Sequence, residues 1–377
     1  MRRGSSNVIL KTIFAEKKIS RKDLAVKTGL TTGAVSKIVA ELLDSGLICE
    51  IGLDKGSKRL GGPTPVFLGI NEDKYDVLTI HIGTTTMVIG ISNLNANILS
   101  VKHLSLTKIK DLSDLLTLIK QTFMEQKKKC RLSDQQILAV GLSIGGNVDK
   151  EGIVHYDEIA FLNNIDLKSA LEDILGLPVY QENVIRALAH GEYWFGKARE
   201  CDNFALVYTG GIAAALICLK GRIIEGLHGA AGFLPYDYAL AHDNFMNKLV
   251  MLKKAREYHA QETESILQTI CPSVADLTEA HIRQAAAEGD KYCIEMLQQY
   301  GRQVGEMLAM IINLIDPEKI ILYNTEEISE IEKSVMFAAL EPLCFNASAR
   351  PEIYIENARA DDFLIGTASL AIQKIFD

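Results

Sequence analysis

Residues 137–149 read ILAVGLSIGGNVD, and this stretch indicates the fold class of the chain. Ile137 to Ile144 is a short apolar run that ends at Gly145-Gly146. A run of this length bounded by glycines predicts a buried strand followed by a turn. It is far shorter than the ~20 apolar residues that a membrane helix needs.

Strands and helices alternate on both sides of this stretch. Before it, two β-rich runs flank Gly83-Thr84-Thr85-Thr86, which predicts a hairpin, and a helix follows over Leu112 to Lys127. After it, the same order begins again near Phe204. The runs that we predict as strands are Val77 to Ile82, Met87 to Ser92, Phe204 to Thr209 and Ala214 to Leu219. A pattern used twice indicates two similar α/β lobes with a cleft between them.

The first seventy residues follow a different pattern. We predict helices over Asn7 to Lys17 and Arg21 to Thr28, and a third that starts after Thr31 or Thr32 and stops at Gly46. Ser20 and Asp23 have the spacing of a capping box, and Gly29 suits a helix end. Two short helices around a glycine turn are typical of a helix-turn-helix.

Two strands, Leu47 to Ile51 and Val66 to Ile70, then enclose a basic, glycine-rich loop suited to phosphate contact. The set therefore predicts a winged helix-turn-helix that binds duplex DNA. The alternative is a three-helix packing module with a solvated loop. The residues that we expect to contact DNA are Arg21, Thr31, Thr32, Gly33, Ser36, Lys37, Lys55, Lys58 and Arg59.

The distribution of charge also separates the first seventy residues from the rest of the chain. Residues 1–70 hold 12 Lys and Arg against 6 Asp and Glu, a net charge of +6, whereas the whole chain carries −8. The remainder therefore carries −14, so only the N-terminal part is expected to meet a polyanion. The seven cysteines show no CxxC spacing, and we interpret them as reduced thiols in a cytoplasmic protein.

The ordered motifs identify a family. Residues 140–149 resemble a strand, a sugar loop and the "VD" of the ROK family of repressors and sugar kinases, and residues 152–154 continue that motif. LPVYQEN at 177–183, EYWFG at 192–196 and GTASL at 366–370 also resemble ROK motifs, in the family's order. The winged helix is what the repressor branch carries.

This resemblance implies the fold and its domains. We expect a winged helix-turn-helix followed by a two-lobed, actin-like sugar-kinase fold of the ribonuclease H-like class. The expected domains are a winged helix at 1–72, a first lobe at 73–188 and a second lobe at 189–377. The closing helix, 363–377, could pack back on the first lobe.

The kinase motifs that the resemblance implies are altered. The family's magnesium-binding D-x-G-G-T reads His81-Ile82-Gly83-Thr84-Thr85 here, and imidazole is a poor magnesium ligand. We interpret His81 as a packing or hydrogen-bonding residue. The catalytic Asp of E-N-D is Val184, which cannot accept a proton, and a lost general base costs ~10²–10⁴ in rate.

The nucleotide motifs have changed as well. Ala213 and Ala215 replace glycines of the phosphate loop G-T-G-I-G-x-G, and Tyr323-Asn324 stands where the family turns on two glycines. We therefore expect no enzyme activity and no cofactor.

The family's zinc motif is missing too. ROK proteins carry a His followed by C-x-C-G-x-x-G-C, whereas Phe233 and Tyr236 stand at the positions of its Glu and His, and no cysteine follows until Cys271. Three thiolates cannot be gathered there, so we expect no structural zinc. His242 and His259 are expected to be solvated helix residues.

A sugar-like effector in the cleft is the remaining expectation. Its polar contacts would come from Gly145, Asn163, Asn164, Glu182 and Asn183, while Phe233 and Tyr236 could stack on a sugar or fill the pocket. A structural role for Asn183 is equally open, as is an unrelated effector or none.

The function that we expect is a homo-oligomeric, DNA-binding repressor of carbohydrate-utilisation genes. Two alternatives remain at this point: a sugar kinase with an added DNA-binding domain, and a regulator whose body binds a protein partner.

Overall fold

The structure of the 377-residue chain is a computed structural model. It describes residues 2–53, 66–155, 158–199, 201–210, 213–232, 248–261, 264–345 and 350–376. The chain forms two compact units, residues 1–200 with 360–377 (unit 1) and residues 201–359 (unit 2). The sequence placed the lobe boundary after residue 188. The units instead divide after residue 200, because helix α6 (Val184–Phe195) spans the expected boundary and belongs wholly to unit 1.

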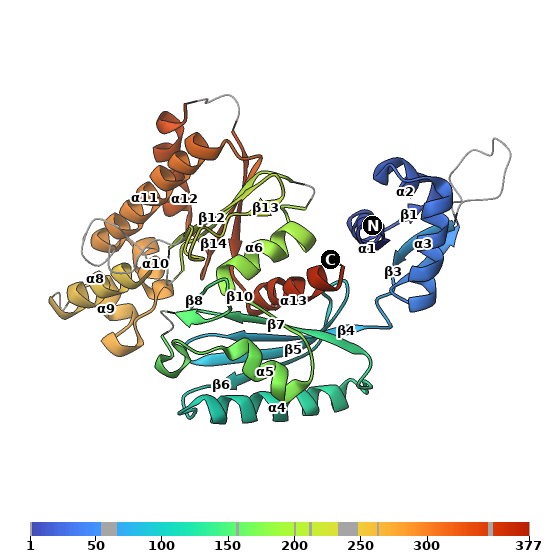
Figure 1. The fold of residues 1–377 in the computed structure, drawn as a ribbon. Coiled ribbons are helices and arrows are strands. Elements are labelled where there is room, and N and C mark those ends of the chain that lie inside the picture. The colour runs from blue at the N-terminus through green and yellow to red at the C-terminus, as the bar shows by residue number, and fades with distance from the viewer. Residues whose placement is uncertain are drawn as a thin grey trace. The chain divides into compact units, whose positions relative to one another are not determined.

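Unit 1 begins with a winged helix (Figure 1), which we call the head. Its elements are α1 (Arg2–Glu16), β1 (Ile19–Ser20), α2 (Arg21–Thr28), α3 (Thr32–Ser45), β2 (Ile48–Leu53) and β3 (Val66–Ile70). The Ser20 hydroxyl caps α2 by accepting from the Asp23 amide, and Gly29 ends that helix at φ 68°, where glycine is favoured. The strands form a sheet in the order β1-β3-β2, of which β1 was not predicted.

The body of unit 1 is a five-stranded sheet in the order β10-β7-β4-β5-β6. Strands β4, β7 and β10 run parallel, and β4, β5 and β6 form an antiparallel meander. In Figure 1, α4 and α5 lie on one face of this sheet and α6 and α13 on the other. Both faces are therefore covered, which explains the continuous apolar run at 137–144.

The elements of this body, apart from α6, follow in chain order: β4 (Asp76–Ile82), β5 (Thr86–Asn93), β6 (Ile98–Ser105), α4 (Leu112–Lys129), β7 (Ile137–Ile144), β8 (Asn147–Val148), β9 (Val154–His155), η1 (Ala160–Leu162), α5 (Leu167–Leu175), β10 (Val179–Asn183) and α13 (Ala360–Phe376). Strand β10 runs to Asn183, and each of its residues pairs with β7.

Unit 2 repeats the sheet design. Its five strands have the order β13-β12-β11-β14-β15, again with an antiparallel meander joined to two parallel strands. The elements are β11 (Phe204–Tyr208), β12 (Ala214–Leu219), β13 (Arg222–Ile223), α8 (Lys248–Gln261), α9 (Ile266–Ile270), η2 (Val274–Asp276), α10 (Glu279–Ala287), α11 (Lys291–Ile315), β14 (Lys319–Asn324), α12 (Glu330–Leu340), η3 (Glu341–Leu343) and β15 (Glu352–Asn357). The repeated design confirms the expectation of two similar lobes.

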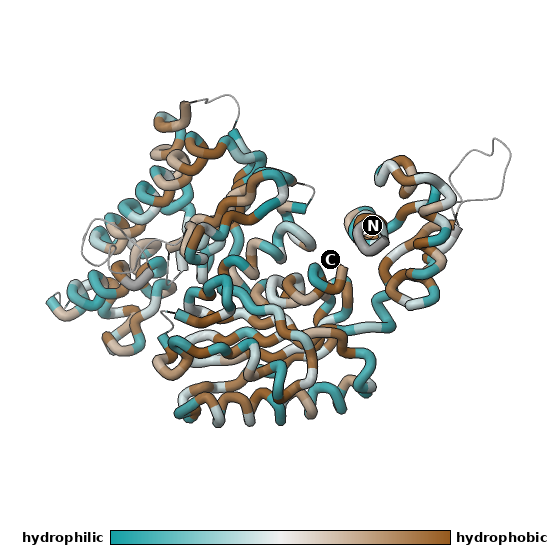
Figure 2. The backbone as a smooth tube through the Cα atoms, in the orientation of Figure 1, coloured by the Kyte–Doolittle hydropathy of each residue, from teal (hydrophilic) through white to brown (hydrophobic). Residues whose placement is uncertain are grey.

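The head shares a core with the body of unit 1. Ile9, Ile13 and Phe14 of α1 are buried in the same cluster as Ala371 and Phe376 of α13. Figure 2 shows apolar residues along α13 and along the strands of the sheet beneath it. The head is therefore packed on the body rather than only tethered to it, and burial of this apolar surface stabilises the contact.

Candidate DNA interface and effector site

Helix α3 presents a polar face to solvent. Val35, Val39 and Leu42 bury the opposite side of the helix in the head. The residues of α3 and its cap that we expected to contact DNA are all exposed: Thr31, Thr32, Gly33, Ser36 and Lys37. They lie at the N-terminal end of the helix, which is the end that a recognition helix directs into the major groove.

Single contacts refine this surface. The Thr31 hydroxyl accepts from the Ala34 amide at 3.3 Å and so caps α3. No heavy atom lies within 4 Å of a Cβ built on Gly33, so the backbone is open to solvent there. The Arg21 guanidinium pairs with Glu50 at 3.2 Å through one of its nitrogens. Lys55, Lys58 and Arg59 lie outside the described residues.

An aromatic cluster joins the head to the body. The ring of Phe14 on α1 lies 5.2 Å from those of Trp194 and Phe195 on α6, and 5.1 Å from that of Phe376 on α13. Edge-to-face contacts of this kind add ~0.5–1.5 kcal/mol beyond their buried area. Two body helices therefore end against one residue of the head.

Asn183 organises the loop where we expected the effector. Its Oδ1 accepts from the Ile185 amide at 2.8 Å and caps α6, and its Nδ2 donates to the carbonyls of Gly145 and Gly146 at 3.1 and 2.9 Å. The side chain is only 2% exposed. Asn183 therefore holds the loop of Gly145 and Gly146 in place. Of these two glycines, Gly145 is exposed and Gly146 is buried.

Glu182 is held by a buried arginine. Its Oε1 accepts from the Arg186 guanidinium at 2.7 Å and from the Asn183 amide at 2.6 Å. Arg186 is 1% exposed and also donates to the Val148 carbonyl. A buried charge pair of this kind is costly to break, because either partner alone would be left uncompensated. Sequence reasoning missed Arg186, although its i,i+4 spacing from Glu182 is visible.

A small hairpin brings the asparagines 163 and 164 toward this loop. Val148 of β8 pairs with Val154 of β9, and the Val154 carbonyl accepts from the Asn164 amide at 2.8 Å. Asn164 is exposed and has φ 62°, and the Asn163 amide group donates to the Ala160 carbonyl. Backbone pairing therefore connects the glycine loop, the hairpin and both asparagines within unit 1.

His81 occupies the position of the family's magnesium carboxylate. Its Nδ1 lies 3.0 Å from the Ser143 hydroxyl, which in turn lies 2.6 Å from that of Thr367 on α13. Its ring stacks on Phe363 at 5.1 Å. Burial lowers the pKa of His81 to about 4, so the ring is neutral at pH 7. The interpretation of His81 as a packing and hydrogen-bonding residue is therefore confirmed.

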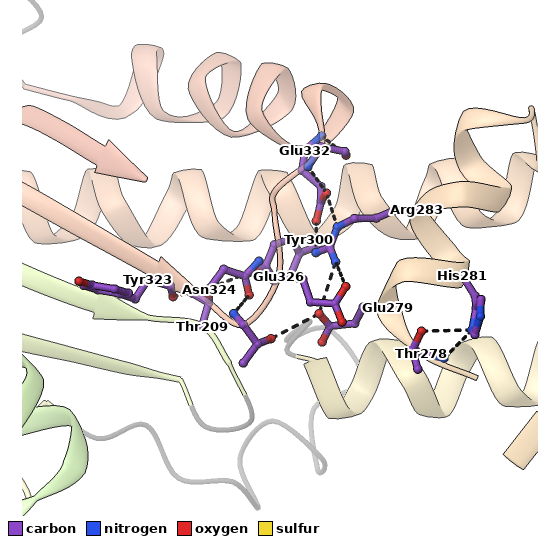
Figure 3. Close-up of polar contacts among 12 residues, drawn as sticks. Thr209, Thr278, Glu279, His281, Arg283, Tyr300, Tyr323, Asn324, Glu326 and Glu332 are labelled. Atoms are coloured by element: carbon purple, nitrogen blue, oxygen red, sulfur yellow. Dashed lines mark hydrogen bonds and ion pairs between the residues drawn. The ribbon is translucent and has the colours of Figure 1, made fainter. Parts of the chain in front are cut away.

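A buried ion-pair cluster lies at the carboxyl end of the unit 2 sheet (Figure 3). Arg283 donates to both oxygens of Glu332 at 2.9 Å, and it also lies 3.4 Å from Glu279 and 3.8 Å from Glu326. Glu332 is fully buried and Glu279 is 2% exposed. No family motif points to this cluster, and only the i,i+4 pair of Glu279 and Arg283 was visible in the sequence.

Two tyrosines lie against Thr209 and Gly210, which follow β11 in unit 2. The Tyr300 hydroxyl donates to the Thr209 hydroxyl at 2.7 Å. A Cβ built on Gly210 would lie 2.3 Å from the Tyr208 hydroxyl, so the Tyr208 ring lies against Gly210. Burial, together with the charge of Glu279, raises the pKa of Tyr208 to about 12. Gly211, Ile212, Phe233, Tyr236 and His242 lie outside the described residues.

Two further properties concern metals and membranes. Among the described residues, no group of three His, Cys, Asp or Glu side chains could hold a metal ion. Within the same residues, none of the helices has the length and apolar character to cross a bilayer. His259 was expected to be solvated, and this was wrong. Its Nε2 lies 2.7 Å from the Cys271 carbonyl, and the residue is 6% exposed.

Comparison with known proteins places the chain. The sequence profile of the ROK family matches residues 77–236 and 255–374. This chain belongs to the ROK family. A winged helix-turn-helix DNA-binding profile matches residues 8–48, which include α2 and α3. The resemblance to the repressor branch of the family is therefore confirmed.

Among its relatives are two bacterial transcriptional regulators. The chain is 27% identical to the xylose repressor of Caldicellulosiruptor bescii over 331 residues, which cover 84% of this chain and 82% of that protein. It is 26% identical to the DNA-binding transcriptional dual regulator NagC of Escherichia coli over 354 residues, which cover 88% and 82%.

Solved structures confirm the fold. A ROK family transcriptional regulator described as a homologue of the E. coli MLC protein aligns with a TM-score of 0.79 at 23% identity and covers 100% of this chain and 96% of its own. A ROK family glucokinase from Streptomyces griseus in complex with glucose and AMPPNP has a TM-score of 0.62 at 20% identity, and it covers 78% of this chain and 98% of its own.

Proposed function

We propose that this ROK protein is a cytoplasmic, DNA-binding repressor of carbohydrate-utilisation genes that has no kinase activity. The observation that carries the proposal is the exposed N-terminal face of α3, on a head packed against a ROK body. The named repressors among its relatives support the same function. Two heads in a homo-oligomer would read two half-sites of an operator.

The effector of this repressor is a sugar or a sugar derivative, and its site is the Gly145 loop of unit 1. The xylose and N-acetylglucosamine repressors among the relatives favour this class of ligand. The exposed Gly145 and Asn164, together with the half-buried Asn163, would supply direct contacts. Asn183 and Glu182 would act by holding the loop, although an arriving hydroxyl could replace one of their present partners.

Helix α6 supplies a route from this site to the head. Asn183 caps one end of the helix at the glycine loop, and Trp194 and Phe195 at the other end contact Phe14. Twelve helical residues span ~18 Å at 1.5 Å per residue, so a shift of the loop would be carried along a rigid element. The loop and the head would then have two arrangements, one before and one after the shift. An effector controls DNA binding only if it binds one of these arrangements more tightly than the other.

The salt dependence of DNA binding tests the interface. Duplex fragments from upstream of the chain's own gene and of the neighbouring genes would be titrated with wild type, Lys37→Ala and Lys58→Ala/Arg59→Ala at several salt concentrations. Each lost phosphate contact should weaken binding and reduce the log–log salt slope by ~0.9. Lys120→Ala, an exposed residue of α4 in the body, is the matched control. Equal affinities and slopes in all four proteins would show that α3 and the wing are not the interface.

A phosphotransfer assay tests the kinase alternative. With ATP and a panel of hexoses and N-acetylated sugars, turnover should stay at background, because Val184 and His81 cannot replace a general base and a magnesium carboxylate. Metal analysis should find well under one zinc per chain. Turnover that disappears when a residue of the Gly145 loop is changed would instead establish a kinase.

A further inference from the structure

Two acidic residues lie on the outer face of α3. Glu41 and Asp44 are exposed, one and two helical turns after Lys37, whereas Val39 and Leu42 between them are buried in the head. Residues four apart in a helix share a face, so Glu41 lies beside Lys37 on the side that meets solvent. A carboxylate on this face repels the phosphates of DNA, so its presence calls for a reason.

The charge of the outer face changes along the helix. Residues 32–37 hold one lysine, Lys37, and no acid, whereas residues 40–45 hold Glu41 and Asp44 and neither lysine nor arginine. The free backbone N–H groups of the first turn also favour a nearby phosphate. The N-terminal half of α3 is therefore attracted to DNA and the C-terminal half is repelled, and Glu41 is the first acid that a bound duplex meets.

The position of Glu41 brings its carboxylate to the edge of the groove. Glu41 follows Gly33 by eight residues, which is ~12 Å along the helix axis. The major groove is ~12 Å wide, so a helix that enters by its N-terminal end places Glu41 near the far wall and Asp44 beyond it. Ala40, the exposed neighbour of Glu41, carries only a methyl group and does not hold the helix away from the bases.

The chemistry of a carboxylate restricts what it can contact there. Its oxygens only accept hydrogen bonds, whereas phosphates and the guanine edge offer only acceptors in the major groove. Cytosine presents an amino group that donates, and it is the base that Glu ordinarily reads. A carboxylate that loses its water without gaining a donor weakens the complex. Within the described residues, the Glu41 carboxylate has neither a hydrogen bond nor an ion pair, so it is available for this contact.

We infer that Glu41 is a specificity-determining residue of the head. Its carboxylate accepts a hydrogen bond from the amino group of a cytosine in each half-site, and it weakens binding to DNA that lacks this base. Discrimination of this kind acts through a penalty on the wrong sequence as much as through a contact with the right one. The inference rests on the proposed function, because α3 must be the reading helix. It goes further by adding an acid to the basic and polar contacts and by naming the base that this acid reads.

Removal of single charges from α3 is the test. Glu41→Gln and Asp44→Asn would be compared with wild type by anisotropy, on a random duplex and on an operator that wild type enriches from a random library. Glu41→Gln should bind the random duplex about threefold more tightly, because a unit charge ~7 Å from a phosphate in water interacts with it by about RT. The operator should gain less, because a neutral amide is a weaker acceptor for the cytosine amino group. Asp44→Asn, the matched control, should change both affinities alike. Both variants should keep the thermal unfolding profile of wild type, since both side chains are exposed.

Base substitution in the operator tests the named contact. Replacement of the cytosine by thymine, whose O4 only accepts, should weaken wild type about tenfold and Glu41→Gln much less. A ratio of operator to random affinity that is the same in Glu41→Gln and Asp44→Asn overturns the inference, and so does an operator in which wild type and Glu41→Gln have the same base requirements at every position. Failure of wild type to enrich any sequence overturns the proposed function instead.

Discussion

His81 shows how one substitution changes the chemistry of a strand end. A carboxylate at this position would remain charged and attract a cation. The imidazole instead lies between Ser143 and Phe363 and is neutral at pH 7, since burial lowers its pKa to about 4. The position therefore contributes packing and a hydrogen bond to α13 through Ser143 and Thr367.

The same burial makes folding stability depend on pH. The unfolded chain binds a proton at His81 below pH ~6.5, whereas the folded chain does so only below about 4. Stability is therefore complete above pH 6.5 and is lost as the pH falls toward 4. We expect His81 to account for a loss of about 2 kcal/mol between pH 7.5 and pH 5.

Urea unfolding of wild type and His81→Asn at the two pH values measures this loss. The variant should lose about 2 kcal/mol less than wild type on acidification. Burial also lowers the pKa of His190 to about 4. His190 is present in both proteins, so its contribution to the loss of stability cancels when the two are compared. Equal losses in the two proteins would show that His81 titrates normally.

Some residue roles were predictable and others were not. The loss of the general base at Val184 and the packing role of His81 follow from residue type at a motif position. The role of Asn183 depends on which backbone carbonyls come within reach of its amide, which only the fold decides. The burial of Arg186, Arg283 and His259 likewise depends on long-range packing.

At the scale of elements, α6 and α13 cross at two glycines. A Cβ built on Gly191 would lie 2.8 Å from Gly366 Cα, and one built on Gly366 would lie 2.6 Å from the Ala187 carbonyl oxygen. The absence of side chains there allows the two helices to approach closely. Both helices also contact Phe14, so their crossing sets how the head is seated on the body.

Alanine substitutions at two helical glycines test this close approach. Gly191→Ala should destabilise the protein by ~1–3 kcal/mol, because the added methyl group forces the backbones of α6 and α13 apart. Gly33→Ala adds the same methyl group to α3 in open space and should be neutral or stabilising by up to ~1 kcal/mol. Chemical denaturation of both variants provides the comparison. Equal effects of the two substitutions would contradict the crossing.

Elements themselves were largely predictable. The bounds of α2, β3, β7 and β12 agree with the sequence patterns, because caps, glycines and apolar runs define them locally. Strand β1 is two residues long and exists only because it pairs with β3, so no local pattern marks it. The expected lobe boundary after residue 188 differs from the division after residue 200, because α6 belongs to unit 1 through its packing on α13. That packing joins residues far apart in the chain, so no local pattern indicates it.

At the scale of the whole chain, the aromatic cluster is where the head and the body of unit 1 meet. Phe14→Leu keeps an apolar side chain there but removes the ring contacts with Trp194, Phe195 and Phe376. We expect effector-dependent release of DNA to shrink at least about threefold in this variant, since coupling between sites is ordinarily worth only 1–3 kcal/mol. Anisotropy titrations of labelled operator with and without a sugar that releases wild type would measure it.

Phe123→Leu is the matched control, because Phe123 is buried on α4 and contacts none of the head residues of the cluster. It should respond to the sugar as wild type does. A response of Phe14→Leu that equals those of wild type and the control would show that the signal does not pass through the aromatic cluster.

Selection of DNA from a random duplex library tests the central claim most directly. Full-length wild type and Lys37→Ala would each be carried through several rounds of binding and sequencing. We predict that wild type enriches one specific sequence arranged as two related half-sites, and that Lys37→Ala loses or relaxes that enrichment. Recovery of no specific sequence by wild type, or of the same sequence with the same enrichment by both proteins, would contradict the account.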